Sequence, residues 1–380
     1  MRSFLFGPEH DAFRQTVRQF IEREVAPHAE QWERDGGFPR DLFRRFGDLD
    51  LLGLQYPEAY GGTNAGPVYE AVLMEELSRC GSGGVAGAIG AHIAIATPPI
   101  FRHGSEEQKQ RWLIPAVKGT AIAALAITEP GGGSDVAALR TRAVRNADHY
   151  VVNGSKLFIT NGTRADFLVT AVRTKEQGGH RGISLLVVER GTPGFKASRL
   201  ETLGWRTSET SELSFADARV PIGNLLGEEN HGFGYIMETF QWERIWAAVS
   251  SAAGAQRSLE LATAYARERV TFGHPLAELP VIRHRLADMA LEVEAARRLA
   301  YHALWLYATG QPCVKEVSMA KLAATEAAVR VADQALQIFG GYGYSMEFPI
   351  QRAWRDARLG PIGGGTSEIM REIIARELDL

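Results

Sequence analysis

The sequence has few of the features that mark disulfide frameworks, metal sites or charged binding surfaces. Its 380 residues include two cysteines, Cys80 and Cys313, and neither belongs to a CxxC pair, so neither disulfides nor a zinc site are expected. His92 and His231 stand alone, and no metal site is predicted. The net charge is −3 without a run of Lys or Arg, which argues against nucleic acid or a membrane as partner. No apolar run near the N-terminus suits a signal peptide or membrane helix, so a cytoplasmic location is expected.

The first and last thirds of the chain have apolar residues at helical spacing. Residues 8–120 predict several helices, with Pro8 in a first turn and Ser105 as an N-cap. The later segments 233–269, 281–309, 313–340 and a last helix from Thr366 are typical of a four-helix bundle.

The middle of the chain changes to the pattern of short strands. Asn153-Gly154 lies between two apolar runs and predicts a hairpin turn, and Asn161-Gly162 predicts another tight turn. We therefore predict an α+β multidomain fold. It has an N-terminal α-helical domain (1–120), a middle β-barrel or sandwich domain (121–228) and a C-terminal four-helix bundle (229–380).

One predicted helix carries an unusual pair of charges. Between Glu238 and Arg257 the only charged residues are Glu243 and Arg244, among apolar and small residues, which suggests a helix buried on all sides. A buried carboxylate is costly unless it is paired or neutral, and burial raises its pKa toward that of a base useful near neutrality. Taken alone, the pair is either a structural ion pair or a catalytic base with a neighbouring cation.

Two glycine-rich loops are candidates for ligand contacts. ALAITEPGGGSD, residues 124–135, ends a strand in three glycines, with hydroxyls at Thr128 and Ser134. Such a loop permits close approach to a planar or phosphorylated group, although it matches neither GxGxxG nor the Walker pattern. Gly363, Gly364 and Gly365 precede Thr366, a candidate N-cap, which predicts an anion site for phosphate or ribitol groups.

Eight motifs in order along the chain carry a resemblance to a known family. They are PEAYGG, TEPGGGSD, FITNG, LGWRTSETSELSFADARVP, RERVTFG, QIFGGYGY, RDAR and GGGTSEIM. The chain resembles the acyl-CoA dehydrogenases, an FAD-dependent family with an α domain, a β domain and a C-terminal four-helix bundle. This resemblance implies FAD as cofactor, an acyl-CoA substrate, an electron-transfer flavoprotein as electron acceptor, and a homotetramer or homodimer.

The resemblance also implies which residues bind FAD and substrate. Thr128 would donate its hydroxyl to the pyrimidine end of the flavin, and Phe158 would stack on the flavin where many members have Trp. Arg269, Phe272, Gln337, Gly340 and Gly341 match residues that reach FAD from a neighbouring subunit. The full set of implied FAD-binding residues is Leu125, Ala126, Ile127, Thr128, Gly133, Ser134, Phe158, Ile159, Thr160, Arg269, Phe272, Gln337, Ile338, Gly340, Gly341, Thr366 and Glu368. The implied substrate-binding residues are Ser134, Gln241, Arg244, Gly364 and Gly365.

The position of the catalytic base departs from the commoner family pattern. Many members carry a glutamate where this chain has Gly364, whereas long-chain and isovaleryl-type members place it on the first bundle helix, before an arginine. That position is Glu243, followed by Arg244. Glu243 is therefore the predicted base for the α-proton, with the β-hydride passing to flavin N5. Arg244 would help hold CoA or pair structurally with Glu243 or Glu238.

Other departures from the family pattern leave the identity of the substrate undetermined. Leu279-Pro280 replaces a usual FAD contact, and Gly363 replaces a Tyr that packs over the acyl chain in many members. Trp242 and Trp246 could narrow the resulting space or belong to the core. Two alternatives to acyl-CoA oxidation remain: the same reaction on a carrier-protein-bound acyl group, and a redox-silent flavin-binding protein, which the glycine at position 364 would suit.

Overall fold

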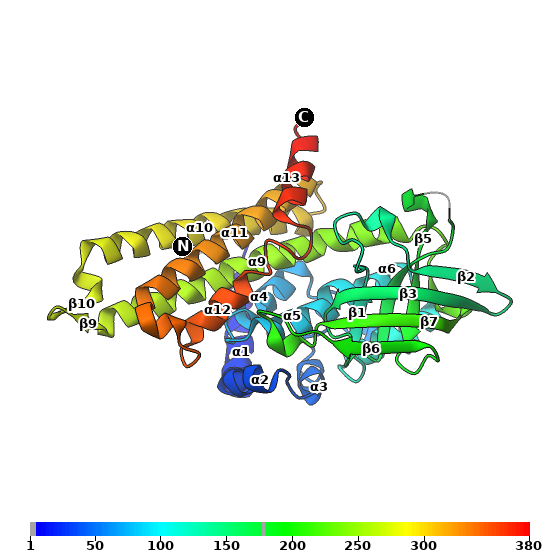
Figure 1. Ribbon diagram of the computed structural model, residues 1–380, viewed down its shortest axis with the longest axis horizontal. Coiled ribbons are helices and arrows are strands. Elements are labelled where there is room, and N and C mark those ends of the chain that lie inside the picture. Colours follow the sequence, from blue (N-terminus) through cyan, green and yellow to red (C-terminus); the bar gives the residue numbers. More distant parts are fainter. Residues whose placement is uncertain (1–4, 177–178) are drawn as a thin grey trace.

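The computed structural model describes residues 5–176 and 179–380, and its first part is helical (Figure 1). Pro8 lies in the first turn of its helix and Ser105 Oγ accepts a hydrogen bond from Gln108 N at 3.2 Å, so both helix-start predictions are confirmed. The elements are α1 (Pro8–Glu24), α2 (Ala29–Asp35), α3 (Asp41–Gly47), α4 (Pro67–Leu77), α5 (Gly83–Gly90), the π-helix η3 (Ala91–Ala96), α6 (Pro98–His103), α7 (Glu106–Gln108), the π-helix η4 (Lys109–Leu113) and α8 (Ile114–Val117).

The stretch from α5 to α6 is a buried core segment. Gly83–His103 is long and apolar enough to cross a membrane by length and composition alone, yet 89% of its most apolar window is buried inside the protein. His92 lies within it, fully buried, with Nε2 3.0 Å from Ala116 O and Nδ1 accepting from Ala123 N. Burial lowers the pKa of His92 to about 4, so this histidine is a neutral structural residue.

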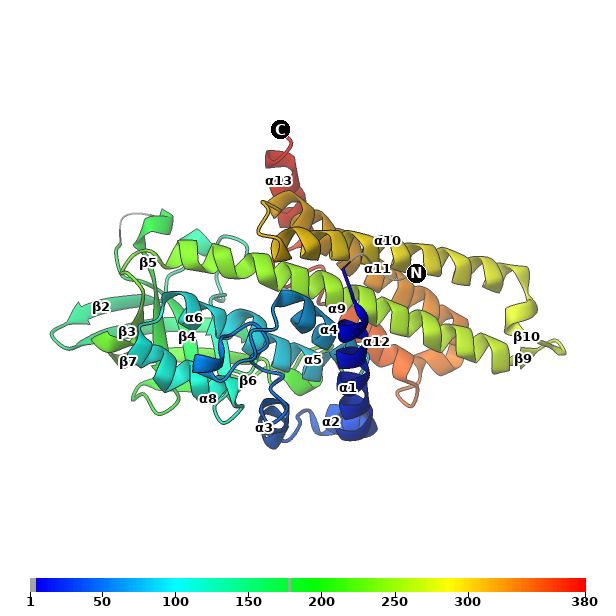
Figure 2. The ribbon, with the colours of Figure 1, turned by 180° about the vertical axis from the view of Figure 1, so that it is seen from behind.

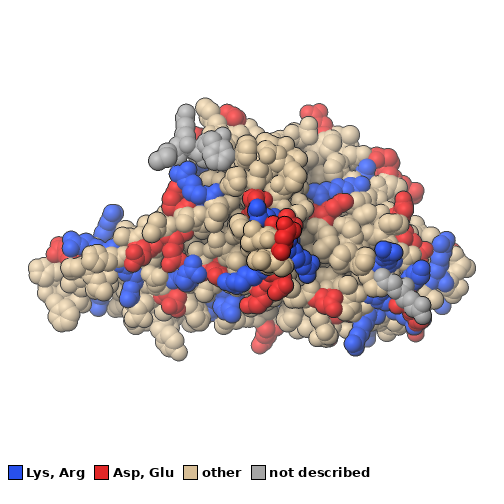
Figure 3. All heavy atoms as spheres, turned by 90° about the horizontal axis from the view of Figure 1, so that it is seen from above, with Lys and Arg blue, Asp and Glu red and all other residues tan. Residues whose placement is uncertain are grey.

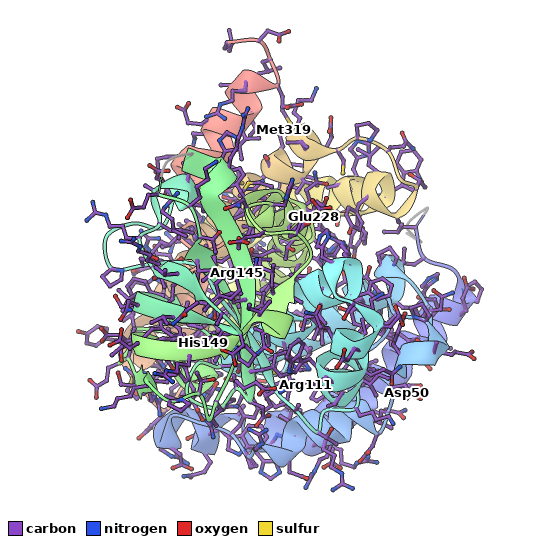
Figure 4. The ribbon with its side chains drawn as sticks, turned by 90° about the vertical axis from the view of Figure 1, so that its right-hand side faces the viewer. Asp50, Arg111, Arg145, His149, Glu228 and Met319 are labelled. Atoms are coloured by element: carbon purple, nitrogen blue, oxygen red, sulfur yellow. The ribbon has the colours of Figure 1, made fainter. Side chains whose placement is uncertain are left out.

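The middle part of the chain forms one mixed sheet. The strands are β1 (Ala123–Ala126), β2 (Arg142–Asn146), β3 (His149–Ile159), β4 (Phe167–Arg173), β5 (Ile183–Glu189), β6 (Phe195–Arg199), β7 (Ser211–Pro221) and β8 (Leu225–Leu226). Their order is β6-β7-β3-β2-β4-β5-β8, and β1 pairs in parallel with β4. Figure 4 views this end of the molecule, where Arg145 and His149 are labelled on the strands in front of the bundle.

The hairpin predicted at Asn153-Gly154 is wrong. Strand β3 continues through both residues, and the turn between β2 and β3 lies at Ala147 and Asp148. Gly154 has φ +141°, a Cβ built on it would lie 2.7 Å from Thr141 Cα, and the register against β7 shifts there. The glycine therefore serves a β-bulge and a close approach rather than a turn.

The turn predicted at Asn161-Gly162 is confirmed, with Asn161 at φ +65°. It joins β3 to β4, and these two strands are separated in the sheet by β2. The turn therefore leads into a crossover rather than a hairpin.

The last part of the chain contains three long helices and two short ones. They are α9 (Gly232–Glu268), α10 (Pro280–Ala308), α11 (Val314–Phe339), α12 (Pro349–Ala357) and α13 (Ser367–Arg376), and the hairpin β9 (Val270–Thr271) and β10 (His274–Pro275) joins α9 to α10. Thr366 Oγ1 accepts from Ile369 N, so the predicted N-cap of α13 is confirmed. The sequence reasoning missed α12, although its nine residues are strongly amphipathic and Pro349 lies in its first turn.

Helix α9 connects all three parts of the molecule. It runs along the long axis from the sheet to the β9–β10 hairpin at the far end of the bundle (Figures 1 and 2). Its Trp242 is 1% exposed and donates from Nε1 to Glu70 Oε1 at 2.7 Å, which ties α9 to α4. On the face shown in Figure 3, acidic and basic side chains are interspersed over the surface.

Candidate active site

A cavity of about 1460 Å³ opens where the three parts of the chain meet. Its walls come from the loop after β1, the end of β3, one face of α9 and the loop before α13. Helix α9 is therefore not buried on all sides as predicted, because one face lines this space. The cavity brings together most of the predicted site residues: Leu125, Ile127, Thr128, Gly133, Ser134, Phe158, Ile159, Thr160, Gln241, Glu243, Arg244, Gly364, Gly365 and Thr366.

The loop after β1 is held in place by a buried ion pair. Lys156 on β3 is fully buried and donates from Nζ to Glu129 Oε1 at 2.8 Å and to Ile127 O at 3.0 Å. The Glu129 carboxylate also accepts from the backbone N–H groups of Arg140 and Thr141. Burial opposes ionisation of Glu129, but Lys156 and these donors outweigh it and lower its pKa. The pair fixes the backbone on both sides of Thr128.

Phe158 presents its ring to the cavity from a strained backbone. Its φ is +60° and the residue is 62% exposed, although both the fully buried Lys156 and the buried Ile159 lie close to it on the same strand. Bulky residues rarely adopt this left-handed conformation, and such outliers gather at functional sites. In the loop after β1, Gly131 and Gly132 face open space, because a Cβ added at either residue would meet no atom within 4 Å. An exposed aromatic face beside a bare glycine loop suits a planar ring.

Glu243 lies in the cavity wall beside Gly364. A Cβ built on Gly364 would lie 3.4 Å from Glu243 Oε1, and Gly364 has φ +64°, which disfavours any side chain there. The Oε2 atom of Glu243 is enclosed and has no hydrogen-bond partner. Burial raises the pKa of Glu243 to about 7, and the charges of Arg244 and Lys321 act in the opposite direction. An unpaired carboxyl poised near neutrality is suited to move a proton.

Arg244 contacts the terminal loop rather than a carboxylate. Within the described chain no ion pair joins it to Glu243, and Glu238 instead lies 3.2 Å from His103 Nε2. Arg244 Nε donates to Gly364 O at a long 3.5 Å. Burial lowers the pKa of Arg244, while Glu243 opposes that shift. The structural pairing with Glu243 or Glu238 is therefore not supported.

The two tryptophans of this part of α9 have different surroundings. Trp242 belongs to the core, whereas Trp246 lines the cavity. A Cβ on Gly90 would lie 2.2 Å from Trp246 Cζ2, and one on Gly87 would lie 2.0 Å from Trp205 Cζ3. The two indoles meet edge to face with ring centres 6.2 Å apart. The glycines of α5 thus admit two indoles that form one wall of the cavity.

The remaining predicted residues lie elsewhere in the chain. Arg269, Ile338, Gly340 and Gly341 line a second depression of about 610 Å³ near the hairpin end of the bundle. Phe272 lies between β9 and β10 and is 95% exposed. Gln337 and Glu368 are exposed and Ala126 is buried in the sheet core. A single chain therefore does not gather all the predicted cofactor contacts into one cavity.

The buried charged residues near the cavity that sequence reasoning missed include Lys156, Glu129 and Lys321. Lys321 on α11 is fully buried and donates from Nζ to Gly360 O and Gly365 O. A lone lysine in the alanine-rich run VSMAKLAATEAA was the available signal. Among the residues that the structure describes, no group of three or more His, Cys, Asp or Glu is placed to hold a metal ion.

Models of known protein families match nearly the whole chain in three successive parts. The acyl-CoA dehydrogenase N-terminal domain matches residues 7–120, the middle domain 124–218 and the C-terminal domain 230–378. A probable acyl-CoA dehydrogenase of Bacillus subtilis (strain 168) is 41% identical over 99% of this chain and 99% of its own length. The chain belongs to the acyl-CoA dehydrogenase family.

Solved structures of the family agree with this membership. An acyl-CoA dehydrogenase from Geobacillus kaustophilus is 45% identical and superposes with a TM-score of 0.97 over 100% of both chains. A chain in a structure of the electron transferring flavoprotein of Acidaminococcus fermentans is 37% identical, with a TM-score of 0.96 over 99% of both chains.

Members of this family are oxidoreductases that carry FAD. The residues of the cavity fit that cofactor. The exposed Phe158 ring suits the flavin, Gly131 and Gly132 leave its approach open, and Thr128 supplies a hydroxyl on a rigid loop.

Proposed function

We propose that this protein is an FAD-dependent acyl-CoA dehydrogenase that converts an acyl-CoA thioester to the trans-2-enoyl-CoA, with Glu243 as its base. The observation that carries the proposal is the position of Glu243: a half-buried carboxyl with no partner for Oε2, beside Gly364 and in the same cavity as the Thr128 loop and Phe158. Electrons would pass on to an electron-transfer flavoprotein.

The chain's own residues supply the proton chemistry. Glu243 takes the α-proton of the thioester as that C–H bond breaks, and the electron pair left behind forms the α,β double bond. FAD, when bound, accepts the β-hydrogen as hydride. Enclosure of Glu243 Oε2 keeps water from that oxygen, which supports the raised pKa of the base.

Other cavity residues would hold the two ligands. Thr128 would hydrogen-bond the pyrimidine end of the flavin, Phe158 would stack on it, and Ser134 would lie between the phosphates and CoA. Arg244, on the cavity wall beside Gly364, would attract the anionic CoA portion. Each assignment predicts weaker binding of one ligand when that side chain is removed.

A second copy of the chain would complete the FAD site. The predicted contacts at Arg269, Phe272 and Gly341 lie apart from the main cavity of their own chain. Phe272, Val270 and Tyr344 are exposed apolar residues in this part of the bundle, and burying them against a partner is favourable. We therefore include a homodimer or homotetramer in the proposal. Light scattering measures the oligomer, and an Arg269→Ala variant should lose FAD while keeping its helical content.

The proposed function is tested by anaerobic titration of the purified flavoprotein with acyl-CoA thioesters of varied length and branching. Bleaching of the flavin absorbance by at least one thioester is expected. Bleaching only by a carrier-protein-bound acyl group would identify the alternative substrate class. No bleaching by either kind of thioester would indicate a redox-silent flavin-binding protein.

A further inference from the structure

The loop beneath Glu243 is fastened by a lysine from a different helix. Lys321 extends from α11 and is fully buried. Its ammonium donates to Gly360 O at 2.8 Å and to Gly365 O at 2.5 Å. These carbonyls lie on either side of Gly364, the residue beside the Glu243 carboxyl. Lys321 thus ties together the two ends of the 360–365 loop, which forms an arch beside the Glu243 carboxyl.

The 360–365 loop contains two residues with positive φ angles. Gly364 has φ +64° and Gly365 has φ +97°, so the backbone turns sharply between the two carbonyls that Lys321 holds. Glycine permits this conformation but does not enforce it, because its unfolded backbone is the most flexible of all residues. Backbone hydrogen bonds from Ser367 N to Pro361 O and from Gly363 N to Leu359 O hold part of this loop, and the two hydrogen bonds from the Lys321 ammonium add a constraint from a different helix.

Lys321 has no carboxylate partner within ion-pair distance in the described chain. The charged groups that face it are Glu243 and Arg244 on α9, Glu326 on its own helix and Glu368 on α13. Burial lowers the pKa of Lys321 to about 8, and Glu243 is the largest opposing influence. Among the described residues, Arg244 most strongly and then Lys321 favour the ionised form of Glu243 against the effect of burial. Each buried charge therefore stabilises the ionised form of the other.

We propose that Lys321 is a positioning residue for the reaction: its ammonium, bound to Gly360 O and Gly365 O, fixes the 360–365 loop beside Glu243 and adds its positive charge to that of Arg244 near this carboxyl. The proposal rests on the proposed role of Glu243 as the base. It predicts that a neutral residue at position 321 leaves the base protonated at pH values where the wild-type protein is active.

The test follows the ionisation of Glu243 directly, without substrate. Infrared difference spectra between the holoprotein and its Glu243→Gln variant identify the carboxyl band of Glu243, which is then titrated against pH. In Lys321→Met the pKa of Glu243 should rise by about one unit or more. Lys321→Arg retains the charge and should leave that pKa near the wild-type value. Lys315→Met, on the first turn of α11, is the matched control and should cause no shift.

Lys321→Gln serves as a second neutral variant should Lys321→Met fail to fold. Its amide can still donate to one loop carbonyl, so it retains part of the clasp while removing the charge. The expected result is again a raised pKa of Glu243. An unchanged pKa in a folded neutral variant would overturn the counter-charge role and leave Lys321 as a purely structural clasp.

A kinetic measurement separates this inference from the proposed function. Exchange of the α-hydrogen of a bound acyl-CoA with deuterated water, followed by NMR, reports the base without hydride transfer. At a pH below the pKa of Glu243, Lys321→Met should exchange about tenfold more slowly, and the difference should shrink as pH rises. A wild-type protein that exchanges nothing contradicts the proposed function, whereas the infrared titration still decides the role of Lys321.

Discussion

The cavity is flanked by two buried lysines that face glutamates in different ways. Lys156 contacts Glu129 at 2.8 Å, and both groups have their remaining polar atoms bound to the backbone. Lys321 binds only backbone carbonyls, and the glutamate that it faces, Glu243, has an oxygen without any partner. We call the first arrangement saturated, because both carboxylate oxygens of Glu129 accept hydrogen bonds, and the second incomplete, because Glu243 Oε2 accepts none.

This difference distinguishes a pair that supports a loop from a carboxyl that can take part in the reaction. Both oxygens of the Glu129 carboxylate already accept hydrogen bonds and Lys156 favours its ionised form, so this pair holds the Thr128 loop rather than taking a proton from a substrate. Glu243, in contrast, keeps an oxygen that makes no hydrogen bond, and its pKa is raised to about 7 where that of Glu129 is lowered. The same residue types therefore have opposite tasks because of the number of hydrogen bonds each makes.

The largest expected effect comes from removing the available oxygen. Glu243→Gln should retain FAD and bind acyl-CoA, yet flavin reduction in a stopped-flow experiment should slow by about 10²–10⁴-fold or more. Glu70→Gln is the matched control. Glu70 is also a carboxyl whose pKa burial raises to about 7, but its oxygens accept from Gln55 and Trp242 in the core. Equal loss in the two variants would contradict the distinction between a saturated and an available carboxyl.

Breaking the saturated pair should damage stability before activity. Lys156→Met leaves Glu129 buried without its cation, and such a change costs about 3–5 kcal/mol of unfolding free energy. Urea unfolding and FAD retention measure the effect, with the exposed Lys196→Met on β6 as control. The double variant Lys156→Met with Glu129→Gln should recover part of the loss, because no unpaired charge then remains.

Enlarging the cavity wall should change substrate preference by a smaller amount. Trp246→Ala removes an indole that packs on Gly90 and lines the cavity. Relative kcat/KM should move toward longer or bulkier acyl-CoA thioesters by about 10–200-fold, the range for a change in pocket size. Trp242→Phe, in the core, should leave the order of preference unchanged. A preference that is the same in Trp246→Ala and the wild type would place the acyl group elsewhere.

The smallest effect concerns pH and stability. The raised pKa of Glu243 means that the folded state holds a proton that the unfolded state releases, between about pH 4.5 and about 7. The free energy of unfolding of the wild-type protein therefore falls as pH rises through that window, because the buried carboxyl must ionise. Glu243→Gln has no carboxyl at this position and avoids that loss. Thermal unfolding should show the variant to be the more stable protein above pH 7 and nearly equal below pH 4. If Glu243→Gln were instead less stable than the wild type above pH 7, Glu243 would have to be paired with a cation in solution.

Much of the site could be predicted because its motifs are local. The glycines of the Thr128 loop, the Thr366 cap and the Phe158 strand each lie within a few consecutive residues, and the order of the motifs carried the family resemblance. The Asn153-Gly154 hairpin failed for the opposite reason. Whether a glycine forms a turn or a bulge depends on the strand that approaches it, here through Thr141, and not on its neighbours in sequence.

The sequence by itself determined the family and the order of helical and sheet regions. It also identified Glu243 as the candidate base, because position 364 carries glycine in place of the commoner glutamate. Only the tertiary structure decided that Glu243 and Gly364 are neighbours, that Arg244 faces the loop, and that Lys321 holds it. Those contacts join residues far apart in the chain, and their free energies depend on burial and geometry, which no local pattern encodes. The cavity wall at Trp246 was likewise decided by the tertiary structure, since a glycine on α5 makes room for the indole.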